Sequence, residues 1–249
     1  MRRCVAAFQI VMSVGIFGLA PVRASERAIW DYSGQYGPSL WGEISSDYTV
    51  CTSGQRQSPI SIEQSFDTVL DAPEFDWRSA GWEVVNTGNL IALRAQDGGT
   101  TMLDGVGYRL REISLHRPSE HALGGKHFDM EMQFMHETRE GQMLGISVFL
   151  SNGGTNAVFE QIIGNAPPSV EDDPIAIDEL DLTALVTDAS DQYRYMGSLT
   201  YPPCREGVTW VVLQDPLAVS NAAMLAFALL YDGNARPLQA LNDRFVLTD

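Results

Sequence analysis

All four histidines of the chain, His116, His121, His127 and His136, lie within one short segment. Imidazole is a common zinc ligand, and a catalytic zinc site usually combines three protein ligands with one open position for water. Zinc lowers the pKa of that water to about 7, which makes hydroxide available at neutral pH. The cluster therefore suggests a metal site, provided that the surrounding strands bring the imidazoles together.

Strand alternation limits what these histidines can do. Over positions 108–116, alternation predicts one face with Leu110, Glu112, Ser114 and His116, and the other with Arg109, Arg111, Ile113 and Leu115. Over positions 131–136, Glu131, Gln133 and Met135 share one face and His136 points the other way. His116 can thus face a partner strand that carries Gln133, but no second histidine is placed beside it. Spacing alone does not predict a three-histidine site, and we expect His121 and His136 to be hydrogen-bonded structural residues.

The elements that must position these side chains are mostly strands. Short runs with strand character recur at 82–86, 90–94, 108–116, 131–135 and 144–150. Turn clusters such as Asp97-Gly98-Gly99 and Ser151-Asn152-Gly153-Gly154 separate them. The best helical segment is 221–230, and a weaker one is 181–185. No internal repeat or interdomain linker is visible, so we expect one mainly β domain with short helices.

Composition narrows the classes of partner. The chain has 249 residues, of which 45% are apolar and 19% charged, and its formal net charge is −16. The apolar fraction excludes a disordered chain. The negative charge argues against nucleic acid and anionic membranes as partners, because both would be repelled.

The first 24 residues have the layout of a secretory signal peptide. Arg2 and Arg3 precede an apolar stretch, and the segment ends in Val22-Arg23-Ala24, with a small residue at a plausible cleavage point. An uncleaved anchor helix is the alternative, but the stretch is short for a membrane span of about 20 residues. We therefore expect residues 1–24 to be removed and residues 25–249 to form a periplasmic or secreted domain with no membrane span.

Cysteine usage agrees with export. Cys4 would leave with the signal peptide, so Cys51 and Cys204 remain as an even pair, which predicts one disulfide. Such a long loop would add about 4–5 kcal/mol of stability in the chain-entropy model. Two separate buried thiols are the alternative.

A series of motifs in order along the chain carries a family resemblance. The run Leu115-His116-Arg117-Pro118-Ser119-Glu120-His121 resembles the zinc-strand signature of the α-class carbonic anhydrases. The resemblance covers nearly the whole mature chain, in Trp30-Asp31-Tyr32, Tyr36-Gly37-Pro38, Trp41, Gln57-Ser58-Pro59-Ile60, Asn86-Thr87-Gly88, the run 195–204, Val208-Thr209-Trp210, Arg236-Pro237-Leu238-Gln239 and Leu241-Asn242-Asp243-Arg244. It implies a single domain around a large, mostly antiparallel twisted sheet, and hydration of CO2 by a zinc-bound hydroxide.

The same resemblance implies that two of the three zinc ligands are replaced. The family's first ligand position is Ser114, the second is retained as His116, and the third is Gln133. A neutral hydroxyl and an amide are poor zinc donors, and even changes around the ligands commonly weaken metal sites 10–100-fold. We therefore expect no cofactor, with zinc bound weakly if at all.

Other family positions are retained or altered around these ligands. Thr200 matches the threonine that accepts a hydrogen bond from zinc hydroxide, and Glu120 matches the glutamate that orients it. His121 and Glu131 match positions that support the zinc ligands, and Leu199 and Trp210 match walls of the CO2 pocket. Met135 stands where valine is usual, and Asn89 replaces the proton-shuttle histidine. Cys51 and Cys204 match the disulfide of many exported members.

These departures give two functional hypotheses. The first is an exported carbonic-anhydrase-like protein without ordinary CO2 hydration, which acts by binding an unknown small molecule or protein. The alternative is a carbonate dehydratase, or a related hydrolase, whose remodelled metal site combines His116 with Gln133, water and the carboxylate of Glu112. In a structural role, Glu112 would instead hydrogen-bond Ser114 or His116, or pair with an arginine. The sequence does not predict the oligomeric state.

Overall fold

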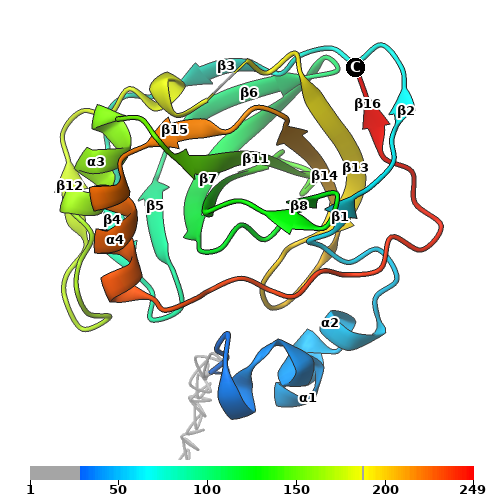
Figure 1. Cartoon of the computed structure of the whole chain (residues 1–249), viewed down its shortest axis with the longest axis horizontal. Coiled ribbons are helices and arrows are strands. Elements are labelled where there is room, and N and C mark those ends of the chain that lie inside the picture. Colours follow the sequence, from blue (N-terminus) through cyan, green and yellow to red (C-terminus); the bar gives the residue numbers. More distant parts are fainter. Residues whose placement is uncertain (1–28, 187) are drawn as a thin grey trace, which may run out of the picture.

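The centre of the fold is a thirteen-stranded twisted sheet, which runs across the middle of the molecule in Figure 1. The structure is a computed structural model that describes residues 29–186 and 188–249. The predicted signal peptide at 1–24 lies outside the described residues. No helix of the described part is long and apolar enough to cross a membrane.

The strands of this sheet are β2 Phe66–Asp67, β3 Glu74–Trp77, β4 Trp82–Asn86, β5 Ile91–Ala95, β6 Gly99–Leu103, β7 Val106–His116, β10 Met130–Glu137, β11 Met143–Asn152, β12 Ile175–Ile177, β13 Gln192–Ser198, β14 Glu206–Leu213, β15 Leu217–Val219 and β16 Leu247–Thr248. Its main order is β12-β4-β5-β7-β10-β11-β14-β13-β16-β2. The pairs β11–β14, β11–β15 and β16–β2 are parallel and the other pairs of this sheet are antiparallel. The predicted mainly β fold around a mostly antiparallel sheet is confirmed.

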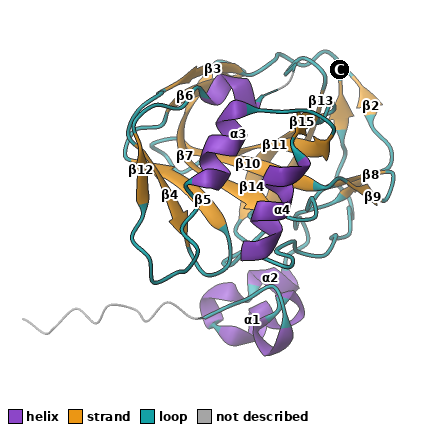
Figure 2. Cartoon of the chain, turned by 60° about the vertical axis from the view of Figure 1, so that its left-hand side comes forward, coloured by secondary structure: helices purple, strands orange, loops and turns teal. Residues whose placement is uncertain are grey.

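Short elements surround the sheet. A small second sheet holds β1 Ser61–Ile62, β8 Ala122–Leu123 and β9 Lys126–His127. The α-helices are α1 Trp41–Ile44, α2 Val50–Ser53, α3 Ala157–Gly164 and α4 Asn221–Leu230, and 3-10 turns cover Gly34–Tyr36, Pro38–Leu40, Ser46–Tyr48 and Leu182–Leu185. Figure 2 shows α3 and α4 side by side over the sheet, while α1 and α2 lie together at one end of the molecule. The two predicted helical segments are therefore present, the weaker one as a 3-10 turn.

Helix α4 begins and ends where the sequence predicts. The Ser220 side chain accepts a hydrogen bond from the backbone N–H of Ala223, which satisfies one of the free donors of the first turn. Its buried side chains, Ala223, Met224 and Phe227, join the main apolar cluster of the sheet. The N-terminal cap and the buried apolar face therefore both favour a helix at these residues.

Strand β7 departs from simple alternation. Its register against β10 shifts, because Met135 pairs with Glu112 whereas His136 pairs with Leu110. Arg111 is therefore an extra, exposed residue in a β-bulge, and a bulge reverses the facing of what precedes it. Leu110 lies in the same core cluster as Ile113 and Leu115. The predicted face that joined Leu110 to Glu112 is therefore wrong, as is the face that joined Arg109 and Arg111 to Ile113 and Leu115.

A disulfide joins α2 to the loop after β13. Cys51 and Cys204 form the predicted disulfide across a sequence separation of 153 residues. Trp41 is fully buried against this bridge, and Trp30 and Tyr32 pack on the same cluster. The disulfide and the aromatic cluster place Tyr32 beside the sheet, where its ring meets that of His116 edge-on.

Candidate functional site

The positions that the resemblance assigns to zinc ligands do converge. In the pairing of β7 with β10, Ser114 lies opposite Gln133, and His116 lies opposite Glu131. The side chains of Ser114, His116 and Gln133 are fully buried, and Thr200 is 1% exposed. We call this group of four, Ser114, His116, Gln133 and Thr200, the inner chamber.

The imidazole of His116 is held at both ring nitrogens. Nδ1 lies 2.9 Å from the carbonyl oxygen of Asn234, which can only accept, so Nδ1 carries the proton. In the neutral ring Nε2 is then an acceptor, and the hydroxyl of Ser114 donates to it over 2.9 Å. The lone pair that would bind a metal is therefore occupied by Ser114, which stands where the resemblance expects a zinc ligand.

The amide of Gln133 makes three hydrogen bonds. Its Nε2 donates to Glu120 Oε2 at 2.8 Å and to Glu131 Oε1 at 3.0 Å. Its Oε1 accepts from Thr200 Oγ1 at 3.1 Å. Glu120 reaches Thr200 through this amide, since the single hydroxyl proton of Thr200 goes to Gln133. Both donors and the acceptor of the amide are engaged.

The carboxylate of Glu131 accepts hydrogen bonds from several residues around the inner chamber. Its carboxylate accepts from the backbone N–H of Glu120 and His121, both at 2.8 Å, and from Ser147 Oγ. It also pairs with His121 Nδ1 at 2.8 Å. Burial by itself raises the pKa of Glu131, but the charge and hydrogen bonds of His121 outweigh it and lower the pKa to about 2. Glu131 therefore stays ionised throughout the physiological range.

His121 and His136 make the hydrogen bonds that are expected of structural residues. His121 Nε2 lies 2.6 Å from the hydroxyl of Tyr195. His136 Nε2 lies 2.9 Å from Thr101 Oγ1 and its Nδ1 lies 3.0 Å from the carbonyl of Phe134. Burial lowers the pKa of His136 to about 4, although its bonds to backbone carbonyls act in the opposite direction. Both residues are buried and hydrogen-bonded, as the sequence predicts.

Both hydrogen bonds of the Glu112 carboxylate go to residues outside the inner chamber. Its Oε2 accepts from Arg94 Nε at 2.6 Å, and its Oε1 accepts from the hydroxyl of Tyr201 at 3.1 Å. Pairing with an arginine, one of the structural roles considered for Glu112, is therefore what the geometry shows. Tyr201 is half-buried, and its desolvation and the neighbouring Glu112 carboxylate raise its pKa well above the usual value.

The donor set of this region does not fit a catalytic zinc ion. It offers one imidazole, whose Nε2 is occupied, together with a hydroxyl and a fully engaged amide, whereas zinc prefers several imidazoles, thiolates or carboxylates. Within residues 29–186 and 188–249, no three His, Cys, Asp or Glu side chains are grouped as metal ligands would be.

A cleft of about 730 Å³ lies outside the inner chamber, and we call it the outer cleft. It is lined by Ile29, Trp30, Tyr48, Thr87, Gly88, Asn89, Leu90, Arg94, Glu112, Val170, Tyr201, Pro202 and Pro203. None of the four inner-chamber residues lines it. Tyr201 and Glu112 border the outer cleft, and Tyr201 directly follows the buried Thr200.

The remaining predicted site residues divide between these regions. Asn89 lines the outer cleft, where its Nδ2 donates to the carbonyl of Trp30 at 2.9 Å. Met135 and Trp210 are buried in one apolar cluster, and Leu199 packs against it. Sequence reasoning assigned no role to Arg94, Tyr32 or Tyr201. Tyr201 directly follows Thr200 in the sequence, but its hydrogen bond to Glu112 depends on β7, which lies far away along the chain.

Comparison with known proteins agrees with this architecture. A sequence model of the eukaryotic-type carbonic anhydrase family matches residues 36–249. The carbonic anhydrase of Klebsiella pneumoniae is 34% identical over 221 residues, which cover 88% of this chain and 90% of that protein. The α-carbonic anhydrase of Thermovibrio ammonificans, solved with the inhibitor sulfanilamide, is 34% identical with a TM-score of 0.86, covering 89% of this chain and 100% of that one.

A further solved relative is dioscorin in complex with ascorbate. It is 29% identical with a TM-score of 0.82, and the match covers 88% of this chain and 97% of that one. The fold and the position of the buried site thus define a protein of the α-carbonic anhydrase type. The chain belongs to the eukaryotic-type carbonic anhydrase family.

Proposed function

We propose that this family member does not carry out ordinary zinc-dependent CO2 hydration and acts instead by binding a small molecule in the outer cleft. The observation that carries the proposal is the hydrogen bonding of Gln133. At a position that the resemblance assigns to a zinc ligand, its amide is bonded to Glu120, Glu131 and Thr200. Binding a metal there would break these bonds in a fully buried place.

The chemistry of hydration supports the same proposal. Bulk water has a pKa of 15.7, and metal-bound water reaches about 7, so CO2 hydration depends on strong metal binding. The side chain of Asn89, where the family's proton shuttle is expected, does not titrate at neutral pH. Thr200 donates its proton to Gln133 and so has no proton left for Glu120.

A relative illustrates binding by this fold. Dioscorin, which shares the fold, has been solved in complex with ascorbate. Its existence supports a ligand-binding role for a chain of this family, and ascorbate is a reasonable first compound in a binding screen. The relatives named carbonic anhydrase support the alternative, an enzyme with a remodelled metal site around His116.

Metal content and CO2 hydration, measured on one sample, test the proposal. The protein is purified without chelators, its metal is quantified by mass spectrometry, and its hydration rate is followed by stopped flow. We expect little metal and no rate above buffer. The double variant Ser114→His with Gln133→His should take up about one equivalent of zinc, with Ser114→His alone as the partial control. Near-stoichiometric metal and clear turnover in the unmodified protein would overturn the proposal.

We also propose that the protein is exported, to a periplasm or to the medium. The N-terminal sequence pattern supports export, and the Cys51–Cys204 disulfide is compatible with an oxidising compartment. Mass spectrometry of the protein purified from its natural source should give a chain that begins after Ala24. An intact N-terminus on the mature protein would contradict cleavage.

A further inference from the structure

We propose that Arg94 binds the carboxylate of a flat, largely apolar organic molecule in the outer cleft. This inference rests on the proposed binding function and names the chemical class of its ligand. It follows from three features of the described residues: the orientation of Arg94, the free end of its guanidinium, and the aromatic wall next to it.

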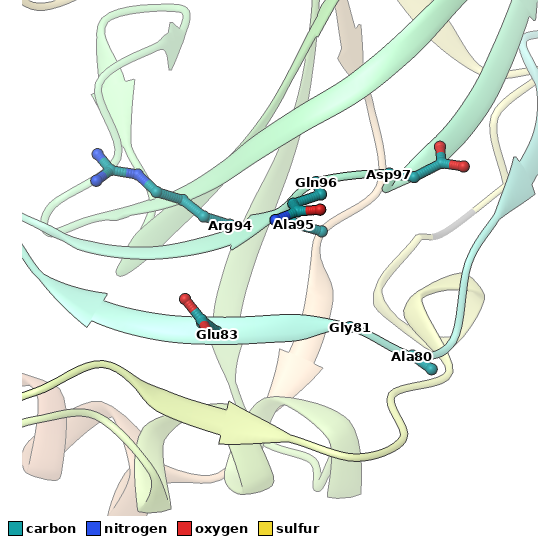
Figure 3. Close-up of a pocket in the computed structure, with 7 residues that line it drawn as sticks. All are labelled: Ala80, Gly81, Glu83, Arg94, Ala95, Gln96 and Asp97. Carbon is teal, nitrogen blue, oxygen red and sulfur yellow. The ribbon is translucent and has the colours of Figure 1, made fainter.

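The orientation of Arg94 is set by a carboxylate on the neighbouring strand. On β5, Arg94 lies between two acidic register partners, Glu83 on β4 and Glu112 on β7. Figure 3 shows the guanidinium turned away from Glu83. Its Nε donates to Glu112 Oε2 at 2.6 Å, while Tyr201 holds the other oxygen of Glu112. The Arg94 side chain is thus aimed by a carboxylate that is itself held in place.

This arrangement leaves the end of the guanidinium available. A guanidinium can bind one carboxylate along its Nε edge and a second through the fork of its two terminal nitrogens. Glu112 occupies Nε, and Nη1 and Nη2 donate no hydrogen bond to any described residue. The Arg94 side chain is 44% exposed and lines the outer cleft. The free fork is therefore open to a ligand.

The wall of the outer cleft favours a flat ligand. The rings of Trp30 and Tyr201 are nearly parallel, with an interplanar angle of 7° and centroids 6.1 Å apart. Leu90, Val170 and Pro202 add apolar surface. Because these two rings stack on each other, they form one rigid aromatic wall of the cleft, and rigid aromatic surfaces favour flat apolar groups.

The charged side chains of the outer cleft favour an anionic ligand. Arg94 and Glu112 are the charged side chains among the lining residues, and both oxygens of Glu112 are already engaged. The unused hydrogen-bond donors of this pair are thus the two terminal nitrogens of Arg94. Since the chain as a whole carries a net charge of −16, a bound anion must be held by local, charge-assisted bonds.

Benzoate is a suitable probe because it combines a carboxylate with one flat ring. We expect a saturable benzoate titration in two-dimensional NMR spectra of the mature protein, with the amide signals of Gly88 and Asn89 shifting. Benzamide, which has the same shape without the charge, should bind at least 10-fold more weakly. Arg94→Gln should weaken benzoate at least 10-fold, whereas Arg139→Gln, the same change at an exposed arginine outside the cleft, should bind as the unmodified protein does. Equal binding of benzoate and benzamide, or no effect of Arg94→Gln, would overturn the inference.

One additional arm separates this inference from the proposed function. The titration is repeated after dialysis against EDTA, with metal content and CO2 hydration measured on the same preparation. Benzoate binding that persists without metal and requires Arg94 supports the inference, even if the untreated protein proves to hydrate CO2. Binding that disappears with the metal would place the carboxylate on a metal ion and would overturn both proposals. Turnover with Arg94-dependent binding would overturn the proposed function alone.

Discussion

Thr200 donates its hydroxyl proton to Oε1 of Gln133 over 3.1 Å, and the same amide donates to Glu120 over 2.8 Å. Gln133 therefore stands between two residues that the family resemblance expects to bond directly. The amide converts what the resemblance describes as a catalytic pair into a closed chain of buried hydrogen bonds. We expect this chain of hydrogen bonds to contribute to the stability of the fold.

Gln133→Met tests the structural role of this amide. Methionine has a similar length but leaves Thr200 and one oxygen of Glu120 without a partner inside the protein. Each unsatisfied buried group costs about 1–3 kcal/mol, so the loss of two partners should lower the free energy of unfolding by about 2–6 kcal/mol in urea titrations. Met135→Leu, a volume-conserving change on the same strand, should cost less than about 1.5 kcal/mol. Similar losses in the two variants would show that the amide network adds little.

Closure of the inner chamber predicts which histidine is chemically accessible. His116, His121 and His136 are at most 2% exposed, whereas His127 lies exposed on β9. Diethyl pyrocarbonate, which acylates accessible neutral imidazoles, should therefore modify His127 alone, as read by peptide mass spectrometry near pH 6.5. Tyr201→Ala removes a bulky side chain at the border of the outer cleft and should make His116 the next histidine to react. Rapid modification of His116 in the unmodified protein would contradict a closed chamber.

Acid should destabilise the protein in two overlapping ranges. The folded-state pKa of His136 is about 4, below its ordinary 6.5, so the unfolded chain binds more protons as the pH falls from 6.5 to 4 and stability is lost there. The pKa of Glu131 is about 2, below its ordinary 4.5, so its contribution is complete above pH 4.5 and is lost from there toward pH 2. The His136 shift alone corresponds to about 3 kcal/mol at an order-of-magnitude level.

The variant His136→Gln isolates the first of these ranges. Urea unfolding at pH 7 and at pH 4.5 should show a much smaller pH-dependent loss in this variant than in the unmodified protein. His127→Gln, at the exposed histidine, should keep the full loss and serves as the control. An unchanged pH dependence in His136→Gln would mean that other groups dominate acid unfolding.

The disulfide predicts a large and separable contribution to stability. Replacing both Cys51 and Cys204 by serine removes a link across a separation of 153 residues. The chain-entropy model gives a loss of about 5 kcal/mol in the free energy of unfolding. Unfolding of the unmodified protein under a reducing agent should give the same loss. A difference between the two conditions would point instead to lost packing of the cysteine side chains.

Much of the fold follows from local sequence. The strand at 82–86 and the helix at 221–230 have the predicted bounds, because apolar periodicity and the Ser220 cap act over a few neighbouring residues. The disulfide followed from an even cysteine pair in a chain expected to be exported. The β-bulge at Arg111 was not predictable, since it depends on how β7 pairs with β10 and not on β7 alone.

The sequence by itself determined the chemical types at the site. A hydroxyl at Ser114, an imidazole at His116 and an amide at Gln133 are fixed by residue identity, and so is their poor suitability for zinc. Only the tertiary structure decided which partners take up those groups and where an opening remains. Hydrogen bonds such as Thr200 to Gln133 and Tyr201 to Glu112 join residues 67 and 89 positions apart. Such partners are chosen by packing of the whole sheet, and that packing leaves Arg94, which lines the outer cleft, with a hydrogen bond at Nε alone among the described residues.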